Sequence, residues 1–293
     1  ALADMVRPHC AIITTIAAAH IENFDSMADL AAAKAEILTG IEKGGTAILP
    51  FDNDYFDLLA ATAKTHQVNM LSFSVEGRAD ADSHIERAKL HEACSCVTAN
   101  ICAQAVTYKI GAPGIHQVAN SLAVLTAVHL AGADLALAAL SLADQDGLDG
   151  RGARYRLGGD EVSVTLIDES YNANPTSMAA ALDTLGLSLR KGQGRRIAVL
   201  GDMAELGEGA AHLHGDLAAK VDAADIDLVI TCGALMQNLH DALPAGRLGM
   251  HADNHRDALS ILRRELHGDD VVMVKGSNAS RMGLVVDGLI DML

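Results

Sequence analysis

The second half of the chain repeats one pattern, in which a short, continuously apolar segment is followed by a stretch with helical periodicity. Apolar segments without alternation are typical of strands that are buried on both faces, as in parallel sheets covered by helices. Regular alternation of such strands with helices predicts a doubly wound, mostly parallel α/β sheet. The expected strands are residues 162–168, 196–201, 227–233, 247–251 and 270–277, and the expected helices are residues 176–187, 208–221, 234–241, 255–266 and 279–291.

The first half also alternates strands and helices, and it includes a run of strand formers that fits a hairpin. A Gly/Asp-rich segment, DQDGLDGRG, has the composition of a linker. We therefore expect two domains, residues 1–146 and 147–293. In the first domain the expected strands are residues 10–16, 44–50 and 69–74 with a hairpin within 93–110, and the expected helices are residues 26–41, 56–66, 116–132 and 134–144.

The composition limits the partners of this protein. The chain has 38 acidic and 22 basic residues, a net charge of −16 with His neutral, which argues against binding to nucleic acid or insertion at an anionic membrane. A phosphate ligand is not excluded, because backbone N–H groups and a few cations can hold one. No apolar run reaches the roughly 18 residues of a membrane span. The five cysteines fit no usual zinc or disulfide spacing, which favours free thiols and a cytoplasmic location.

Polar or Gly-rich segments follow several of the expected strands. Ligands of doubly wound sheets bind at the carboxyl ends of the strands, and helices that begin there favour anions. An α/β domain without a site would also have polar loops at this edge, but four such segments together favour a site. The segments are DESYNANP (168–175), GDMAELGEG (201–209), TCG (231–233) and KGSNASR (275–281). No GxGxxG follows a strand and no GxxxxGK[ST] phosphate loop occurs in the 293 residues.

Several ordered motifs resemble the Mur ligases, which are ATP-dependent amide ligases of peptidoglycan precursor synthesis. The motifs are AAAHIENFDS…AKAEI, VLGDMAELG, VKGS, and DESYNANP followed by SMAAAL, and the resemblance runs from residue 1 to the end. It implies the carboxyl portion of a central ATP-binding domain with a mixed sheet, followed by a Rossmann-like ligase domain. The family's uridine-nucleotide domain and GKT phosphate loop are missing from these residues, so we expect a fragment that is inactive alone.

The YNANP pattern favours the branch of the family that adds D-alanyl-D-alanine to UDP-N-acetylmuramoyl-tripeptide through an acyl phosphate. The resemblance implies ATP and Mg²⁺ as cofactors and a cytoplasmic monomer. Another Mur ligase or a folylpolyglutamate synthetase-like amide ligase is the alternative enzyme. A non-catalytic α/β binding module is the alternative of a different class.

The resemblance assigns catalytic and metal-binding roles to two residues of the first domain. His20 matches a magnesium ligand, although an isolated His here would usually be a cap or surface residue. Lys34 matches a lysine that carries a carbamate, which turns a cation into an oxygen ligand suited to Mg²⁺. Without the family, Lys34 would be read as a surface lysine on an apolar helix.

Three further residues of the first domain are candidates for nucleotide binding. His116 and Asn120 are four residues apart and so share a helix face, where the resemblance implies contact with adenine. The alternative is a helix start with polar caps. Asn53, with Asp52, matches a DN pair of the family and is therefore expected on the nucleotide side. Pro50, three residues earlier, departs from the family pattern.

The second domain supplies the remaining candidates. Arg151 matches an arginine that reaches the ATP phosphates, although Arg154 and Arg156 compete for this role. Asp168 matches an acid that accepts bonds from the ribose hydroxyls. The same resemblance places Tyr171 and Asn172 at the nucleotide and Asn174, Lys275, Ser277 and Arg281 at the other substrates, and Asn174 is also the expected cap of the helix that follows.

Overall fold

The computed structural model describes residues 2–19, 21–145, 147–159, 163–244 and 248–292. The chain forms two compact units. Unit 1 comprises Ala1–Ala17 and Asn23–Gln145, and unit 2 comprises Ala18–Glu22 and Asp146–Leu293. In the described part of the chain, no helix has both the length and the apolar character needed to span a membrane.

Unit 1 contains a six-stranded mixed sheet in the order β1-β2-β3-β4-β5-β6, as the family resemblance implied. The first four strands are parallel, and β4, β5 and β6 form an antiparallel meander. The hairpin expected within 93–110 is β5 and β6. The strands are β1 (Cys10–Ile12), β2 (Thr46–Pro50), β3 (Asn69–Ser74), β4 (Ser83–Leu90), β5 (Ser95–Ile101) and β6 (Gln104–Ile110).

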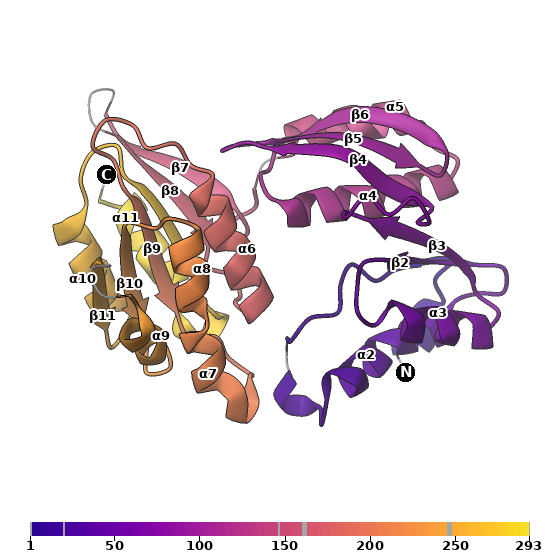
Figure 1. Ribbon diagram of the computed structural model, residues 1–293, viewed down its shortest axis with the longest axis horizontal. Coiled ribbons are helices and arrows are strands. Elements are labelled where there is room, and N and C mark those ends of the chain that lie inside the picture. Colours follow the sequence, from indigo (N-terminus) through magenta and orange to yellow (C-terminus); the bar gives the residue numbers. More distant parts are fainter. Residues whose placement is uncertain (1, 20, 146, 160–162, 245–247, 293) are drawn as a thin grey trace. The chain divides into compact units, whose positions relative to one another are not determined.

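The core of unit 1 lies between this sheet and the apolar faces of α4 and α5. Val118, Leu122 and Leu125 of α4 are fully buried in the same cluster as Ile48 and Val97 of the sheet. Figure 1 shows α4 and α5 along one face of β4, β5 and β6. The helices are α1 (Leu2–Val6), α2 (Met27–Ala35), α3 (Phe56–Thr65), α4 (Ile115–Leu130) and α5 (Leu135–Ser141), and 3-10 turns occupy Ile21–Asn23, Glu36–Gly40 and Leu142–Asp144.

Unit 2 contains a second six-stranded sheet, in the order β11-β10-β9-β12-β8-β7. Five strands are parallel and β7 runs antiparallel along β8, so the expected doubly wound sheet is confirmed. The last strand in sequence, β12, lies between β8 and β9, which creates the change of direction where ligands of such sheets bind. The strands are β7 (Ala153–Gly158), β8 (Ser163–Glu169), β9 (Arg196–Gly201), β10 (Leu228–Cys232), β11 (Leu248–Ala252) and β12 (Val271–Lys275).

Helices cover both faces of this sheet. Met178 of α6 and Leu239 of α9 belong to one buried cluster, whereas Leu262 of α10 and Val285 of α11 belong to another. Ala198 and Val199 are adjacent in β9 and enter opposite clusters, which explains why the strand is continuously apolar. The helices are α6 (Pro175–Gly186), α7 (Ala210–Gly215), α8 (Leu217–Ala223), α9 (Gln237–Ala242), α10 (His255–Glu265) and α11 (Gly283–Ile290), with 3-10 turns at Gly207–Gly209 and Asn278–Ser280 (Figure 1).

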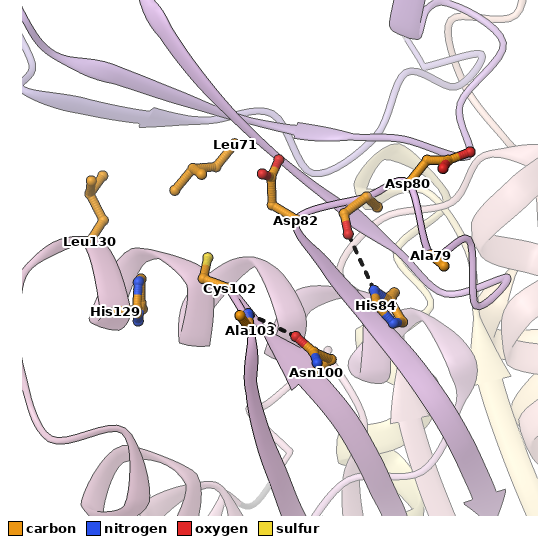
Figure 2. A pocket seen from close by; sticks show the side chains of 11 residues that line it. Leu71, Ala79, Asp80, Asp82, His84, Asn100, Cys102, Ala103, His129 and Leu130 are labelled. Carbon is orange, nitrogen blue, oxygen red and sulfur yellow. Dashed lines mark hydrogen bonds between the residues drawn. The ribbon is translucent and has the colours of Figure 1, made fainter.

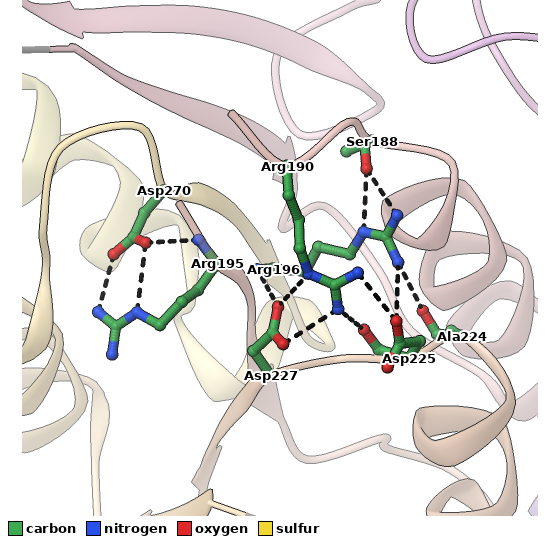
Figure 3. Close-up of polar contacts among 8 residues, drawn as sticks. All are labelled: Ser188, Arg190, Arg195, Arg196, Ala224, Asp225, Asp227 and Asp270. Atoms are coloured by element: carbon green, nitrogen blue, oxygen red, sulfur yellow. Dashed lines mark hydrogen bonds and ion pairs between the residues drawn. The ribbon is translucent and has the colours of Figure 1, made fainter. Parts of the chain in front are cut away.

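An ion-pair network fixes the segments that enter the central strands of unit 2. Arg190 donates from Nε and Nη2 to the two carboxylate oxygens of Asp227, at 2.9 and 3.0 Å. The backbone N–H of Arg196 donates to the same carboxylate at 2.8 Å. Figure 3 shows how these contacts join the chain after α6 to the beginnings of β9 and β10. The network is therefore structural and lies at the amino ends of the strands.

Candidate functional site

The loops that follow β8, β9 and β12 meet at the carboxyl edge of the unit 2 sheet. They surround a pocket of about 310 Å³. Three of the residues expected at a site, Asn172, Asn174 and Ser277, line it together. The remaining lining residues are Ala19, Ala173, Ala204, Glu205, Asn278 and Ala279. Hydroxyl, amide and carboxylate groups from separate loops thus converge in one pocket.

Asp168 at the tip of β8 is buried, and its carboxylate accepts hydrogen bonds from other groups of the chain. Its Oδ2 accepts from the Gly150 N–H at 2.7 Å, and its Oδ1 accepts from the N–H and hydroxyl of Ser170 at 3.0 and 2.6 Å. The Gly152 N–H donates to the Asp168 carbonyl at 2.7 Å. Asp168 therefore fixes residues 150–152 to the sheet edge. The expected contact with a ribose stays a prediction, because a carboxylate has acceptor capacity beyond three bonds.

Arg151 and Tyr171 are stacked on each other beside this anchor. The guanidinium carbon of Arg151 lies 4.0 Å from the centroid of the Tyr171 ring. Both side chains are exposed, the tyrosine to 56%. The arrangement leaves the guanidinium N–H groups at the surface, where they are available to planar or tetrahedral oxyanions.

Lys275 at the end of β12 is 3% exposed and points into the loop that follows β8. Its Nζ donates to the Asn172 carbonyl at 2.9 Å and lies 3.5 Å from Oε2 of Glu169. Burial lowers the pKa of the ammonium group, and the Glu169 carboxylate partly opposes this effect. Lys275 supports the Asn172 wall of the pocket, and direct contact with a substrate stays a prediction.

Of the two candidates that follow Lys275, Ser277 is buried at the pocket and Arg281 is exposed outside it. Ser277 is 2% exposed, donates its backbone N–H to the Asp202 carbonyl at 3.0 Å, and lines the pocket. Arg281 is exposed, has a φ of 55°, and ends the 3-10 turn after β12. Its side chain is not among the pocket lining residues.

His214 contacts the backbone at Met203, next to the pocket lining residues Ala204 and Glu205, and was not among the expected site residues. It is fully buried in α7, and its Nε2 accepts from the Met203 N–H at 2.9 Å. Its Nδ1 lies 2.6 Å from the Ala210 carbonyl, so the neutral Nδ1–H tautomer satisfies both contacts. Burial lowers the pKa of His214. In the sequence, His214 is one histidine in a run with helical periodicity, and its role depends on the loop at Met203 that folds back over it.

The candidates of unit 1 are distributed over several elements. Asn53 donates from Nδ2 to the Ile16 carbonyl at 3.0 Å and so ties the loop after β2 to the segment after β1. His116 and Asn120 lie in the first two turns of α4, half-buried and exposed, respectively. Lys34 is exposed in the last turn of α2. His20, the expected magnesium ligand, lies outside the described residues.

Within the described ranges, no group of three or more His, Cys, Asp or Glu side chains is arranged to hold a metal ion. Another pocket, of about 790 Å³, lies in unit 1 and is lined by residues such as Asp82, His84 and Cys102 (Figure 2). None of the expected site residues lines it. The five cysteines are free, as the sequence predicted.

These features define an α/β protein whose second unit has the ligand-binding edge of a doubly wound sheet. Two family descriptions match the chain, "Mur ligase middle domain" over residues 1–128 and "Mur ligase, glutamate ligase domain" over residues 154–278. The chain belongs to the Mur ligase family.

The chain is similar to curated relatives and to solved structures over nearly its whole length. Two curated UDP-N-acetylmuramoyl-tripeptide–D-alanyl-D-alanine ligases are each 31% identical to it. The match to the Mycobacterium tuberculosis H37Rv enzyme covers 99% of this chain and 59% of that enzyme. The match to the Escherichia coli K12 enzyme covers 98% of this chain and 61% of that enzyme. The fold matches that of MurF from Acinetobacter baumannii with a TM-score of 0.85 and 24% identity, covering 99% of this chain and 61% of that one. MurF from Thermotoga maritima in complex with ADP matches with a TM-score of 0.83 and 22% identity, covering 99% and 63%.

Proposed function

We propose that the complete protein joins D-alanyl-D-alanine to UDP-N-acetylmuramoyl-tripeptide at the expense of ATP, in the cytoplasm. The chain spans 59 to 61% of the length of the two relatives whose names describe this reaction, so the proposal concerns the complete protein. The observation that carries it is the pocket at the carboxyl edge of unit 2, because Asn172, Asn174 and Ser277 come from family motifs and converge there.

The proposed reaction has two steps. A carboxylate oxygen of the tripeptide attacks the γ-phosphorus of ATP, which releases ADP and leaves an acyl phosphate. The amine of D-alanyl-D-alanine then attacks the acyl carbon, inorganic phosphate leaves, and the nitrogen loses a proton. Both steps bring anions together, so the protein contributes mainly positioning and neutralising charge.

The chain's own residues suit parts of this task. The exposed guanidinium of Arg151 can donate paired N–H groups to phosphate oxygens. The amide of Asn120 can pair with the edge of a purine. Asn174 and Ser277 present polar groups to a substrate in the pocket. Magnesium would neutralise phosphate charge, with His20 and the carbamate of Lys34 as the proposed ligands. Among the described residues, no cluster of three or more His, Cys, Asp or Glu side chains is arranged to hold the ion.

Phosphate release by the protein expressed from its complete reading frame tests this proposal. The assay contains ATP, magnesium, UDP-N-acetylmuramoyl-tripeptide and D-alanyl-D-alanine, and the control replaces the dipeptide with L-alanyl-L-alanine. We expect release that depends on the D-dipeptide, with a product heavier by the dipeptide minus water. Residues 1–293 alone should release no phosphate, because they contain no GxxxxGK[ST] loop.

Other outcomes would point to the alternatives. Release that depends on a single amino acid and a shorter muramoyl peptide would indicate another Mur ligase. Release that depends on glutamate and a folate would indicate a folylpolyglutamate synthetase-like enzyme. The absence of release with all of these substrates would favour a non-catalytic binding module.

A further inference from the structure

Three hydrogen bonds, two between backbone groups and one to the Asp168 side chain, hold Arg151 and Tyr171 in a fixed relation. The Arg151 N–H donates to the Leu148 carbonyl at 2.7 Å, which closes a turn. The Tyr171 N–H donates to the Gly150 carbonyl at 3.1 Å, and Asp168 accepts from the Gly150 N–H. The two residues that stack are therefore anchored, through their neighbours, to the same strand tip.

Gly150 allows the two segments to approach this closely. Its φ is +71°, and a Cβ built on it would lie 2.9 Å from the Cβ of Tyr171. A side chain at this position would push the tyrosine away from the turn that carries Arg151. The stack thus depends on a glycine in a left-handed conformation, which L side chains rarely adopt.

Two properties of this region favour an Arg151 guanidinium that is held in one orientation: the neighbouring cation is already paired, and an ordered side chain loses less entropy on binding an anion. Lys275 is a second cation close enough to Arg151 for the arginine to lower its pKa, and it is committed to the Asn172 carbonyl and Glu169. Arg151 is the cation of this pair that reaches the surface. An exposed arginine otherwise samples many rotamers, and fixing it in advance reduces the entropy lost when an anion binds.

We propose that Tyr171 is a positioning residue, whose ring holds the Arg151 guanidinium ready to bind the polyphosphate of a nucleotide. This inference rests on the proposed function for the identity of the ligand. It differs from a direct contact between Tyr171 and the nucleoside, which the family resemblance implied. Tyr171 acts on the phosphates through Arg151.

Calorimetric titration of the complete protein with ATP, adenosine and inorganic tripolyphosphate tests the inference. A cation–π contact at an exposed site contributes about 0.5 to 1 kcal/mol, so Tyr171→Leu should weaken binding of ATP and tripolyphosphate about two- to fivefold. Adenosine affinity should not change. Tyr171→Phe, which keeps the ring, should rescue the affinity. In an Arg151→Met background, Tyr171→Leu should have no further effect.

The outcomes separate the inference from the proposed function. Weaker adenosine binding in Tyr171→Leu, or an equal loss in the Arg151→Met background, would overturn the positioning role. Failure of Arg151→Met to weaken tripolyphosphate binding, or no binding of tripolyphosphate by the unaltered protein, would also overturn it. The positioning role would be supported without the proposed ligase activity if Tyr171→Leu weakens tripolyphosphate binding only when Arg151 is present, and no dipeptide-dependent phosphate release is found.

Discussion

Arg195 and Asp270 form an ion pair in which the carboxylate is completely buried, with Arg195 Nη2 2.8 Å from Asp270 Oδ2. The same carboxylate accepts the backbone N–H groups of Arg195 and His267 at 2.8 and 2.9 Å. It therefore joins the start of β9 to the turn before β12. Both carboxylate oxygens are used, and Figure 3 shows the contacts with Arg195. Loss of the carboxylate would leave the Arg195 guanidinium without its counter-ion and the N–H groups of Arg195 and His267 without this acceptor.

We expect Asp270→Ala to destabilise unit 2 by about 3 kcal/mol, since removing one partner of a buried pair leaves uncompensated charge. Asp225 is the matched control, because its carboxylate pairs with Arg190 but its side chain is 66% exposed. Asp225→Ala should cost less than about 1 kcal/mol. Hydrogen exchange of β9 and β12 peptides along a urea series measures unit 2 alone. Equal losses in the two variants would contradict the importance of burial.

The stability of unit 2 should depend on pH through His214. Burial lowers the pKa of His214 in the folded protein, so below the unfolded pKa of about 6.5 the unfolded chain binds a proton that the folded one does not. Stability should be complete above this pH and decrease as the pH falls toward the folded pKa, with a slope of at most about 1.4 kcal/mol per pH unit.

The contribution of His214 is isolated by substitution. His214→Gln should remove this part of the pH dependence measured by hydrogen exchange of the segment at 203–215. His212 is two residues away in α7 with a side chain that is 83% exposed, so His212→Gln should leave the dependence intact. The interpretation fails if His212→Gln abolishes the dependence and His214→Gln does not.

Gly233 should resist substitution for two reasons that can be separated. Its φ is +105°, and a Cβ would lie 2.5 Å from Oδ2 of Asp202, whose Oδ1 accepts the Met236 N–H at 2.8 Å. Gly132 also has a positive φ, +69°, but nothing lies within 4 Å of its Cβ position.

We therefore expect Gly233→Ala to cost about 2 kcal/mol or more, because it combines backbone strain with displacement of Asp202. Gly132→Ala should cost about 1 kcal/mol from the backbone strain alone. Hydrogen exchange of peptides next to each glycine gives the two values. Equal costs would show that the Asp202 contact is unimportant.

The sequence predicted the parallel strands of unit 2 to within one or two residues, because both faces of each strand are buried and the apolar runs are continuous. It did not predict β7, since ARYRLG has charged residues on its exposed side and pairs only at the edge of the sheet. The strand β4 was missed for a similar reason, as Glu86, Arg87 and Lys89 interrupt its apolar positions. The helix expected at 208–221 is broken at Gly215–Asp216 into α7 and α8.

Part of the site was also accessible from sequence. The rule that parallel strands present their carboxyl ends at one edge was sufficient to bring Asn172, Asn174 and Ser277 together. The partners of Asp168 and Lys275 were not accessible, because Gly150 and the Asn172 carbonyl reach them only through tertiary folding. Neither was His214, whose two contacts are to backbone groups that carry no sequence signal.

Asn174 combines a structural role with a proposed binding role, and two substitutions distinguish them. Its Oδ1 accepts the Ser177 N–H at 2.8 Å and its own N–H donates to the Ser177 hydroxyl at 3.0 Å, which forms a capping box at the start of α6. Asn174→Ala should cost about 1 kcal/mol of unit 2 stability, whereas Asn174→Ser can still cap the helix and should restore most of it.

If the Asn174 amide also contacts a substrate in the pocket, Asn174→Ser should keep the stability but not the activity. Serine has one hydroxyl on a shorter side chain and cannot offer paired donor and acceptor groups. We expect kcat/KM for the proposed dipeptide-dependent reaction of the complete protein to fall in both variants by about tenfold, the value of one hydrogen bond of roughly 1.4 kcal/mol. Full activity in Asn174→Ser would instead reduce Asn174 to a helix cap that happens to line the pocket.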